Sequence, residues 1–407
     1  MLLAFLVGIL ARDFMKYYFI FIFGLLILGC SDTASVYKKG QSKTTSTSID
    51  SVITPKIAIP KPEIQTINNY FRKFVKRRRF NGHIAIAKNG EIVFDTTAGY
   101  SNIRKRIPLK KNAAIQLASV TKPITATVIL QLIEEGKLTL NDTITKFLEL
   151  PKQYKKLTIR HLLAHRSGLS QYYYYCDHKM DNKEHLIYND TVICVINFHN
   201  PEHNFRPDRK HYYSNTNYML LASIIEAVEE KRYSEVLKTR IFDKCGMTDS
   251  FVFDLKKASI PDNLTLGHTQ WNRVFEFDYL DGIVGDKGVF STAKDLIKFD
   301  VLLNNDIIIS DSIKQIAFTP QNKIRDNKSY GYGWRLKMDP NFGKLVYHTG
   351  WWHGNRHIYL KIPKLGYTLV IVSNALRGSV YNINELLKAF TFPTIESSSS
   401  KKDSKVI

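Results

Sequence analysis

Apolar residues recur at helical spacing along residues 124–136, which predicts a mostly buried helix. The periodic positions are Ile124, Val128, Ile129, Leu132 and Ile133. Pro123 fits only within the first turn of a helix, where its missing N–H is not needed, so the helix should begin close to Ser119. Gly136 follows the last periodic residue and predicts the end of the helix.

Short strand-like runs occur near both ends of the chain. Residues 83–87 and 92–95 flank Asn89-Gly90, a pair typical of tight hairpin turns. Three further runs are separated by turn-forming residues: 344–348, 356–362 and 367–373. Mainly helical sequence lies between the two groups, and a last helix is expected over residues 383–390. We predict an α+β fold, in which an antiparallel sheet of N- and C-terminal strands is flanked by helices and carries an inserted, mainly helical subdomain.

The N-terminus carries a predicted targeting signal. Residues 17–28 form an apolar run that follows Lys16 and is short for a membrane span. The run ends in Ile-Leu-Gly-Cys at Cys30, and this ending resembles a bacterial lipoprotein signal, whose cleavage leaves the cysteine as the lipidated first residue. We expect residues 1–29 to form this signal, with translation beginning at Met15, and Cys30 to anchor the protein to a membrane of the bacterial envelope.

Polar sequence without apolar periodicity predicts a disordered tether over residues 30–62 and a tail over residues 393–407. The folded domain is therefore expected at residues 63–392.

The chain carries a formal net charge of +21, which would suit an anionic polymer or surface. Its basic residues are widely scattered, however, and no nucleic-acid-binding module accompanies them, so we expect no nucleic-acid partner.

Cysteine and histidine spacing does not predict a metal site. Cys176 and Cys194 could form a disulfide in an oxidising envelope or remain reduced, and no C-x-x-C sequence occurs. His161 and His165 lie four residues apart, as zinc ligands on a helix do. Leu162, however, replaces the glutamate of the metalloprotease motif, and no third ligand is evident. We expect both histidines to be structural, and we expect no metal and no cofactor.

Three short motifs carry the candidate chemistry: Ser119-Val120-Thr121-Lys122, Tyr213-Ser214-Asn215 and His348-Thr349-Gly350. A serine and a lysine one helical turn apart can share a proton, because an amine that gives up its charge can activate a hydroxyl. Each motif alone is weak, since such spacings are frequent by chance. In this order, they resemble the penicillin-recognising serine hydrolases: class C β-lactamases, D-alanyl-D-alanine carboxypeptidases and related esterases. The resemblance covers roughly residues 80–389.

This resemblance implies catalysis through an acyl-enzyme. Ser119 would attack a carbonyl, and Lys122 and Tyr213 would share the proton transfers as base and later acid. Asn215 would orient Lys122 or the substrate amide. The backbone N–H groups of Ser119 and Trp351 would bind the oxyanion.

The third motif departs from the β-lactamase pattern. His348, Thr349 and Gly350 would line the substrate cleft on an edge strand, with the substrate backbone beside them. His348 replaces a lysine, and a neutral histidine attracts a carboxylate less firmly, which favours peptidase or esterase activity over β-lactam hydrolysis. Trp351-Trp352 could shape the acyl pocket or pack in the core. Arg356 could make the contact to a substrate carboxylate that is lost with the lysine, or it could be a solvated strand residue.

The resemblance favours an envelope serine hydrolase that acts on the amide or ester carbonyl of a small-molecule or peptide substrate, as a D-Ala-directed peptidase or an esterase does. Two alternatives are a true β-lactamase and a non-catalytic protein that binds penicillin or cell-wall peptides. The intact Ser119, Lys122 and Tyr213 favour catalysis, because a binding protein needs none of them.

Overall fold

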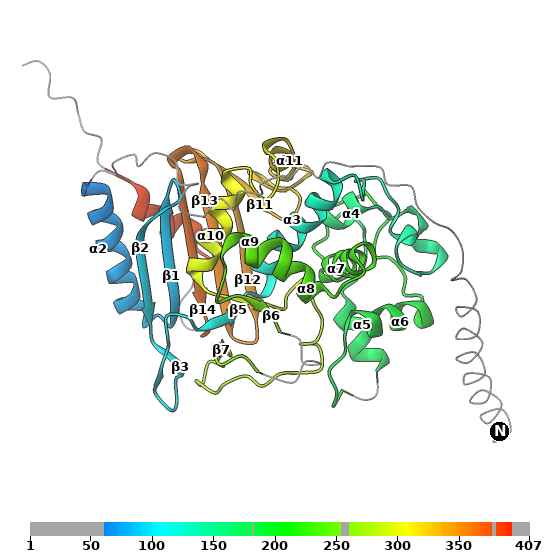
Figure 1. Ribbon diagram of the computed structural model, residues 1–407, viewed down its shortest axis with the longest axis horizontal. Coiled ribbons are helices and arrows are strands. Elements are labelled where there is room, and N and C mark those ends of the chain that lie inside the picture. Colours follow the sequence, from blue (N-terminus) through cyan, green and yellow to red (C-terminus); the bar gives the residue numbers. More distant parts are fainter. Residues whose placement is uncertain (1–60, 181–182, 254–259, 377–379, 393–407) are drawn as a thin grey trace, which may run out of the picture. The chain divides into compact units, whose positions relative to one another are not determined.

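The computed structural model describes residues 61–180, 183–253, 260–376 and 380–392 (Figure 1). The predicted signal with Cys30, nearly all of the predicted tether and the predicted tail lie outside these ranges. The first described helix begins at Lys61, two residues inside the range predicted as tether. Within the described residues, no helix combines the length and the apolar content that crossing a membrane requires.

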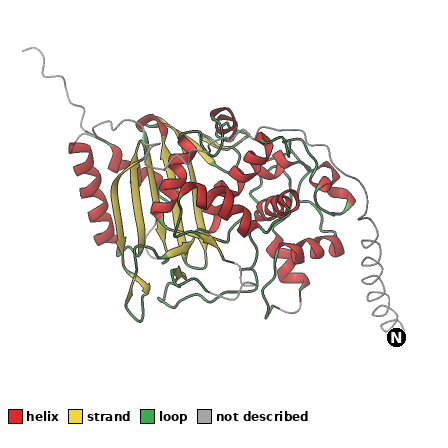
Figure 2. Cartoon of the chain, viewed as in Figure 1, coloured by secondary structure: helices red, strands yellow, loops and turns green. Residues whose placement is uncertain are grey.

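An eight-stranded antiparallel sheet joins the two ends of the described chain, as predicted (Figure 2). Its strand order is β2-β1-β14-β13-β12-β11-β10-β9. The strands are β1 (Gly82–Lys88), β2 (Glu91–Ala98), β9 (Asn322–Arg325), β10 (Lys328–Tyr330), β11 (Arg335–Asp339), β12 (Gly343–Trp352), β13 (Asn355–Ile362) and β14 (Tyr367–Ser373). The N-terminal hairpin is attached to the C-terminal meander through β1 and β14, whose register runs from Gly82 opposite Ser373 to Lys88 opposite Tyr367.

Helices cover both faces of this sheet. Ile84 and Ile86 of β1 pack in a cluster with α2 (Lys61–Arg78) and α12 (Ile383–Leu387). Ala85 and Ala87 point to the opposite face, which α10 (Ala293–Asn304) covers. Because both faces are buried, β1 and β14 carry uninterrupted apolar runs over residues 84–87 and 369–372 and do not alternate with polar residues there.

The central part of the chain is mainly helical and surrounds α3 (Thr121–Glu134), the helix predicted from apolar spacing. The side chains of α3 are buried all round from Thr121 to Leu132, as expected for a helix packed on every side. The other helices are α4 (Ile159–Leu163), α5 (Tyr172–Lys179), α6 (Asn189–His199), α7 (Asn215–Glu229), α8 (Tyr233–Leu237), α9 (Asp243–Cys245) and α11 (Asp311–Ala317). Together with the sheet, they confirm the α+β prediction.

Short elements complete the fold. A four-stranded sheet contains β5 (Ala114–Gln116), β6 (Phe251–Val252), β7 (Leu264–Thr265) and β8 (Val289–Ser291), and a small hairpin contains β3 (Tyr100–Asn102) and β4 (Ile107–Pro108). Single turns are η2 (Ala118–Val120), η3 (Ile144–Lys146), η4 (Lys152–Lys156), η5 (Lys238–Phe242), η6 (Pro363–Leu365) and η7 (Lys388–Phe390). The turn η2 and strand β12 pack together, and this contact brings the first and third sequence motifs to one place.

Candidate active site

Ser119 lies in the turn η2, immediately before α3. The Leu117 N–H donates to the Val289 oxygen at 2.8 Å, and the Val120 N–H donates to the Leu117 oxygen at 3.0 Å. Ala118 has a φ of 48°, in the left-handed region, which costs a residue with a Cβ about 1 kcal/mol. Such strain persists only where the surrounding packing maintains it, so the fold fixes the backbone at Ser119.

Lys122 occupies the first turn of α3, and its side chain is fully buried. Its Nζ lies 2.9 Å from Ser119 Oγ, 2.8 Å from Asn215 Oδ1 and 3.0 Å from the backbone oxygen of Asp286. A carbonyl oxygen can only accept, whereas a hydroxyl can donate or accept. A neutral amine here would donate both hydrogens to the two carbonyl oxygens and turn its lone pair towards Ser119, as deprotonation of the serine requires.

Gln171 holds the second motif in place. Its Nε2 donates to the backbone oxygen of Tyr213 at 2.9 Å, and its Oε1 accepts from the backbone N–H of Asn215 at 2.8 Å. Asn215 is the first residue of α7, and Ser214 occupies the N-cap position. The Ser214 hydroxyl donates to the Ser170 oxygen at 3.1 Å and does not cap the helix. The segment Tyr213-Ser214-Asn215 is therefore anchored to the chain that precedes α5.

The Tyr213 ring is bordered by another aromatic ring and by the side chains of a lysine and an arginine. The His165 ring centroid lies 4.2 Å from the Tyr213 centroid. Lys122 Nζ lies 5.1 Å from that centroid, and the Cζ of Arg335 lies 4.8 Å from it. Arg335 was not identified from the sequence, although it lies within residues 80–389, which the family resemblance covers.

His165 is a fully buried structural residue, as predicted. Its Nδ1 accepts from the backbone N–H of Ser214 at 3.2 Å and lies 3.0 Å from the Nδ2 of Asn217. Burial, and then the nearby charges, hold the pKa of His165 well below its usual value, so its ring is neutral. His165 thus supports Tyr213 through both the ring contact and the following backbone N–H.

His161 also has structural partners. Its Nδ1 accepts from the backbone N–H of Thr158 at 3.1 Å at the start of α4, and its Nε2 lies 2.9 Å from Asp208 Oδ2. Each of the two predicted histidines is therefore engaged by its own protein neighbours, and they do not form a shared ligand pair.

One cluster in the described part of the chain has the spacing of metal ligands: Asp278, Asp281 and His353. His353 Nε2 lies 3.1 Å from Asp278, and Nδ1 lies 3.2 Å from Asp281. Although burial acts against the charged form, the hydrogen bonds to these carboxylates raise the pKa of His353 to about 9. A charged imidazole donates through both nitrogens, so in this structure the three residues form an ion-pair network.

The third motif lies on β12, which is an interior strand of the sheet and not its edge strand. Residues 343–347 of β12 pair with β11. Residues 346–352 pair with β13, and residues 348–352 have no strand on the β11 side within the described chain. The motif therefore lies along a local open edge, where an extended substrate could add as a strand.

His348 is fully buried beneath this edge. Its Nε2 lies 3.1 Å from the Tyr330 hydroxyl, and its Nδ1 lies 2.9 Å from the Thr349 oxygen. Burial, followed by the charges of Arg335 and Lys122, holds the pKa of His348 well below its usual value. A neutral His348 cannot replace the positive charge of a lysine at this position.

Gly350 allows β12 to approach η2 closely. A Cβ at this position would lie 2.4 Å from the backbone oxygen of Leu117. The Tyr381 hydroxyl donates to the Gly350 oxygen at 2.6 Å on the other side.

Trp351 is 61% exposed, which excludes core packing for that side chain. Trp352 is half-buried, and its Nε1 donates to Asp281 at 2.7 Å.

The remaining cysteines are free thiols. Cys176 and Cys245 are buried, and Cys194 is exposed. The alternative of a Cys176–Cys194 disulfide is therefore not realised in the structure.

A family model described as β-lactamase matches residues 67–389. Penicillin-binding protein 4* of Bacillus subtilis is 32% identical over 345 residues, which cover 79% of this chain and 74% of that protein. The teichoic acid D-alanine hydrolase of Staphylococcus aureus is 26% identical over 274 residues, or 66% of each chain, just under two thirds of that relative.

Solved structures share the fold. The penicillin-binding protein of Bacillus halodurans matches with a TM-score of 0.70 and 24% identity, covering 82% of this chain and all of that one. The D-amino acid amidase of Ochrobactrum anthropi matches with a TM-score of 0.65 and 22% identity, covering 81% of this chain and 98% of that one. Since the family match spans most of the described residues and includes all three motifs in their predicted order, the chain belongs to the β-lactamase family.

Proposed function

We propose that this protein is a serine hydrolase that acts through an acyl-enzyme on the amide or ester carbonyl of a D-alanyl substrate. The observation that carries the proposal is the hydrogen bond of 2.9 Å between Lys122 Nζ and Ser119 Oγ. Asn215 and the Asp286 backbone accept from the same amine, so the neutral form of Lys122 would direct its lone pair to the serine. A non-catalytic binding protein would not need this arrangement.

The first step is attack of Ser119 Oγ on the carbonyl carbon. Lys122 accepts the serine proton, while the backbone N–H groups of Ser119 and Trp351 receive the developing oxyanion. Tyr213 passes a proton to the leaving nitrogen or oxygen, and an acyl-Ser119 ester remains. A water molecule then attacks this ester with Lys122 and Tyr213 reversing their roles, and it releases the acid and the free serine.

Two observations support a D-alanyl substrate. The relatives include proteins named teichoic acid D-alanine hydrolase and D-amino acid amidase. The neutral, buried His348 does not provide the positive charge of the β-lactamase lysine, which favours D-alanyl amides or esters over β-lactams. β-Lactam hydrolysis remains the second candidate because a relative is named a penicillin-binding protein.

The decisive experiment detects the acyl-enzyme. Purified residues 31–407 are incubated with a D-alanyl ester, a D-Ala-D-Ala peptide, a p-nitrophenyl ester, nitrocefin and fluorescent penicillin, and the protein is examined by mass spectrometry. We expect turnover of a D-alanyl substrate and an acyl adduct on the peptide that contains Ser119. The Ser119→Ala variant is the control. The absence of any adduct or turnover would reject the function, and turnover by Ser119→Ala would reject the nucleophile.

We also propose that the protein is held in the cell envelope by a lipid on Cys30. The apolar run of residues 17–28 followed by Gly29-Cys30 supports this location. We expect Cys30→Ala to abolish incorporation of labelled palmitate and to release the protein from the membrane fraction. Cys194→Ala removes an exposed cysteine of the folded domain and should leave labelling unchanged. Continued labelling of the Cys30→Ala protein would contradict the anchor.

A further inference from the structure

Two exposed apolar side chains lie on neighbouring loops. Ile107 belongs to the β3–β4 hairpin and is 48% exposed, and Trp271 is 60% exposed in a loop of residues 269–273, the Trp271 loop. The two loops are joined at their base, where the Ile103 N–H donates to His268 Nε2 at 3.2 Å. Figure 1 shows the hairpin, labelled β3, projecting past the ends of β1 and β2.

Both loops are fixed by their own hydrogen bonds. In the hairpin, the Lys105 N–H donates to Asn102 Oδ1 at 2.9 Å, and Arg106 has a φ of 54°, which closes the turn. In the Trp271 loop, the Thr269 N–H donates to the Arg273 oxygen at 2.8 Å across the tip. The exposed surface is therefore preorganised, so a partner could bind it with little further ordering of the chain.

Basic residues surround the two apolar side chains. No Asp or Glu occurs in residues 96–112 or in residues 263–275, so positive charge is not balanced within either segment. The Arg104 guanidinium donates to the Trp271 oxygen at 3.5 Å, which places one of these charges beside the indole. Six exposed basic residues lie in the two segments, and none forms an ion pair within the part of the chain that the structure describes. They are Arg104, Lys105, Arg106, Lys110, Lys111 and Arg273.

This combination fits an anionic membrane better than a soluble polyanion. Basic side chains at a bilayer surface are attracted by acidic headgroups. Tryptophan is stable at the level of the headgroups, where its ring is partly removed from water and its N–H remains hydrated. A soluble polyanion would use only the charge and would leave Ile107 and Trp271 in water.

Helix α2 carries similar charge without the apolar component. Arg72, Lys73, Lys76 and Arg77 are exposed, and their spacing places them on one face of the helix. Among the described side chains of α2, no large apolar one is exposed. This face of α2 therefore provides a matched comparison for the hairpin, with four exposed positive charges and nothing to insert into a bilayer.

We propose that the β3–β4 hairpin and the Trp271 loop dock the protein on an anionic phospholipid bilayer. Ile107 and Trp271 enter the headgroup region, and the surrounding basic residues contact acidic lipids. A chain of 30 residues, such as the predicted tether between Cys30 and Lys61, can reach up to about 100 Å, so an anchor on Cys30 alone would not determine which face meets the membrane. The docking surface gives the folded domain one orientation there.

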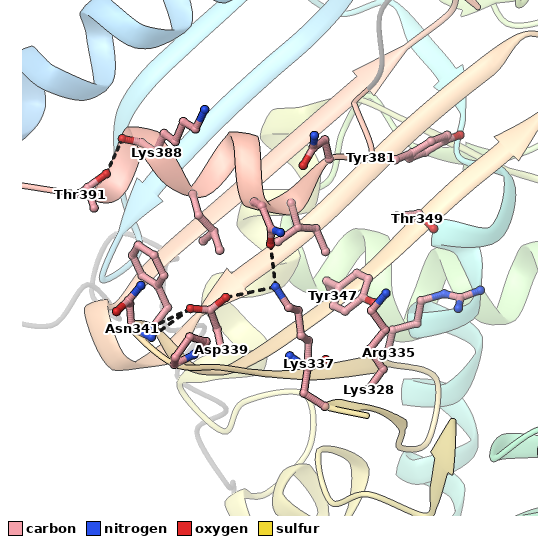
Figure 3. Close-up of a pocket in the computed structure, with 17 residues that line it drawn as sticks. Lys328, Arg335, Lys337, Asp339, Asn341, Tyr347, Thr349, Tyr381, Lys388 and Thr391 are labelled. Atoms are coloured by element: carbon pink, nitrogen blue, oxygen red, sulfur yellow. Dashed lines mark hydrogen bonds and ion pairs between the residues drawn. The ribbon is translucent and has the colours of Figure 1, made fainter. Parts of the chain in front are cut away.

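The docking surface is separate from the pocket beside the third motif. That pocket has a volume of about 900 Å³ and lies between strands β10 to β12 and helix α12 (Figure 3). Thr349 lines it, so it belongs to the candidate active site. Among the described residues that line it, none belongs to the hairpin or to the Trp271 loop, so docking would not occupy the pocket.

The test measures binding to vesicles. Residues 31–407, which include every residue that the structure describes and lack Cys30, are sedimented with two kinds of vesicle. One kind is phosphatidylcholine alone, and the other is phosphatidylcholine and phosphatidylglycerol in equal parts. We expect binding to the anionic vesicles to be roughly 10- to 100-fold tighter than to the neutral ones and to weaken as salt is added. Equal binding to both kinds, or binding to neither, would overturn the proposal.

Two variants separate a specific surface from the net charge of the protein. Each replaces four exposed basic residues with glutamine, one in the hairpin and one on α2. The substitutions are Arg104→Gln, Lys105→Gln, Arg106→Gln and Lys110→Gln in the first, and Arg72→Gln, Lys73→Gln, Lys76→Gln and Arg77→Gln in the second. We expect the hairpin variant to bind anionic vesicles at least roughly 10-fold more weakly than the wild type, and the α2 variant to stay within about threefold. An equal loss in both would contradict docking through the hairpin, and thermal melting verifies that both variants are folded.

Trp271 reports insertion in the wild-type protein. Its emission should shift to shorter wavelength on anionic vesicles and be quenched by brominated phosphatidylcholine, as expected for an indole at the headgroup level. Trp271→Phe should lose this quenching, and the variant is needed because Trp351 is also exposed. Quenching that persists in Trp271→Phe would refute insertion at this loop. Inorganic polyphosphate is the soluble control, and an equal emission shift with it would identify a soluble polyanion as the partner. These measurements require neither turnover nor a lipid on Cys30, so their failure would leave the proposed function and anchor standing.

Discussion

Replacing Lys122 with methionine is expected to lower kcat/KM for a D-alanyl substrate by roughly 10³-fold, because the serine loses its base. The change keeps an unbranched side chain, one atom shorter than lysine, and removes the amine that bonds Ser119, Asn215 and the Asp286 backbone. Two carbonyl oxygens lose a donor, at a cost of about 1–3 kcal/mol each. Removing a buried ionisable group offsets part of that cost, so the free energy of unfolding should change by less than about 2 kcal/mol. Steady-state kinetics and urea unfolding measure the two quantities.

Lys361→Met is the matched control for this prediction. Lys361 is likewise buried, but it forms an ion pair with Asp300, which also accepts the Tyr359 and Thr368 hydroxyls at 2.6 and 2.7 Å. Its loss leaves a buried carboxylate without a counter-charge and should destabilise the fold by about 3–5 kcal/mol, with unchanged kcat in the folded protein. If both variants lost stability and activity in the same proportion, Lys122 would be a structural residue.

The elements predicted correctly from the sequence are those whose local chemistry determines the backbone. Asn89 and Gly90 both have positive φ, 48° and 86°, as the predicted tight hairpin requires. Pro123 lies in the first turn of α3, and Gly136 follows the helix that ends at Glu134. In both cases, a residue with a restricted or unusual conformation marks the boundary of an apolar run.

Elements whose burial depends on distant neighbours were missed. Helix α5 has buried residues at Tyr172, Tyr175 and Cys176, which is helical spacing, but four consecutive tyrosines concealed the buried face. The strands of the four-stranded sheet are two or three residues long, too short for any periodicity. Their strand conformation follows from pairing with partners that are distant in the sequence, such as Phe251 with Phe290 and Ile115 with Ser291.

The residues of the candidate site also fall into two groups: those that the sequence reveals and those that only the fold brings together. Ser119 and Lys122 could be found together because they are one helical turn apart, and the Tyr213 and His348 motifs were added through a family resemblance. Gln171 and Arg335 could not be found, since a glutamine and an arginine have no distinctive spacing. Their importance appears only when the fold places Gln171 against the Tyr213–Asn215 backbone and Arg335 beside the Tyr213 ring.

Gly350→Ala is expected to reduce both activity and stability, because it would separate the two elements that carry the proposed oxyanion donors. The new Cβ would lie 2.4 Å from the Leu117 oxygen and 3.0 Å from the His357 ring. The backbone oxygen belongs to the turn that carries Ser119 and cannot rotate away, so β12 and η2 must move apart. Overpacking of this kind costs about 1–3 kcal/mol of unfolding free energy. A displacement near 1 Å between the Ser119 and Trp351 N–H groups should lower kcat by roughly 10²-fold.

Gly343→Ala is the control on the same strand. Gly343 has a φ of 68°, and the nearest neighbour of an added Cβ would be Lys364 Cδ at 3.8 Å, so alanine there meets conformational strain without a clash. We expect it to cost about 1 kcal/mol and to leave kcat unchanged. Unfolding curves and kinetics of both variants provide the comparison. Since the clash at Gly350 lies directly between β12 and the serine turn, a Gly350→Ala protein with wild-type kcat would show that the N–H groups of Ser119 and Trp351 do not act together on one oxyanion.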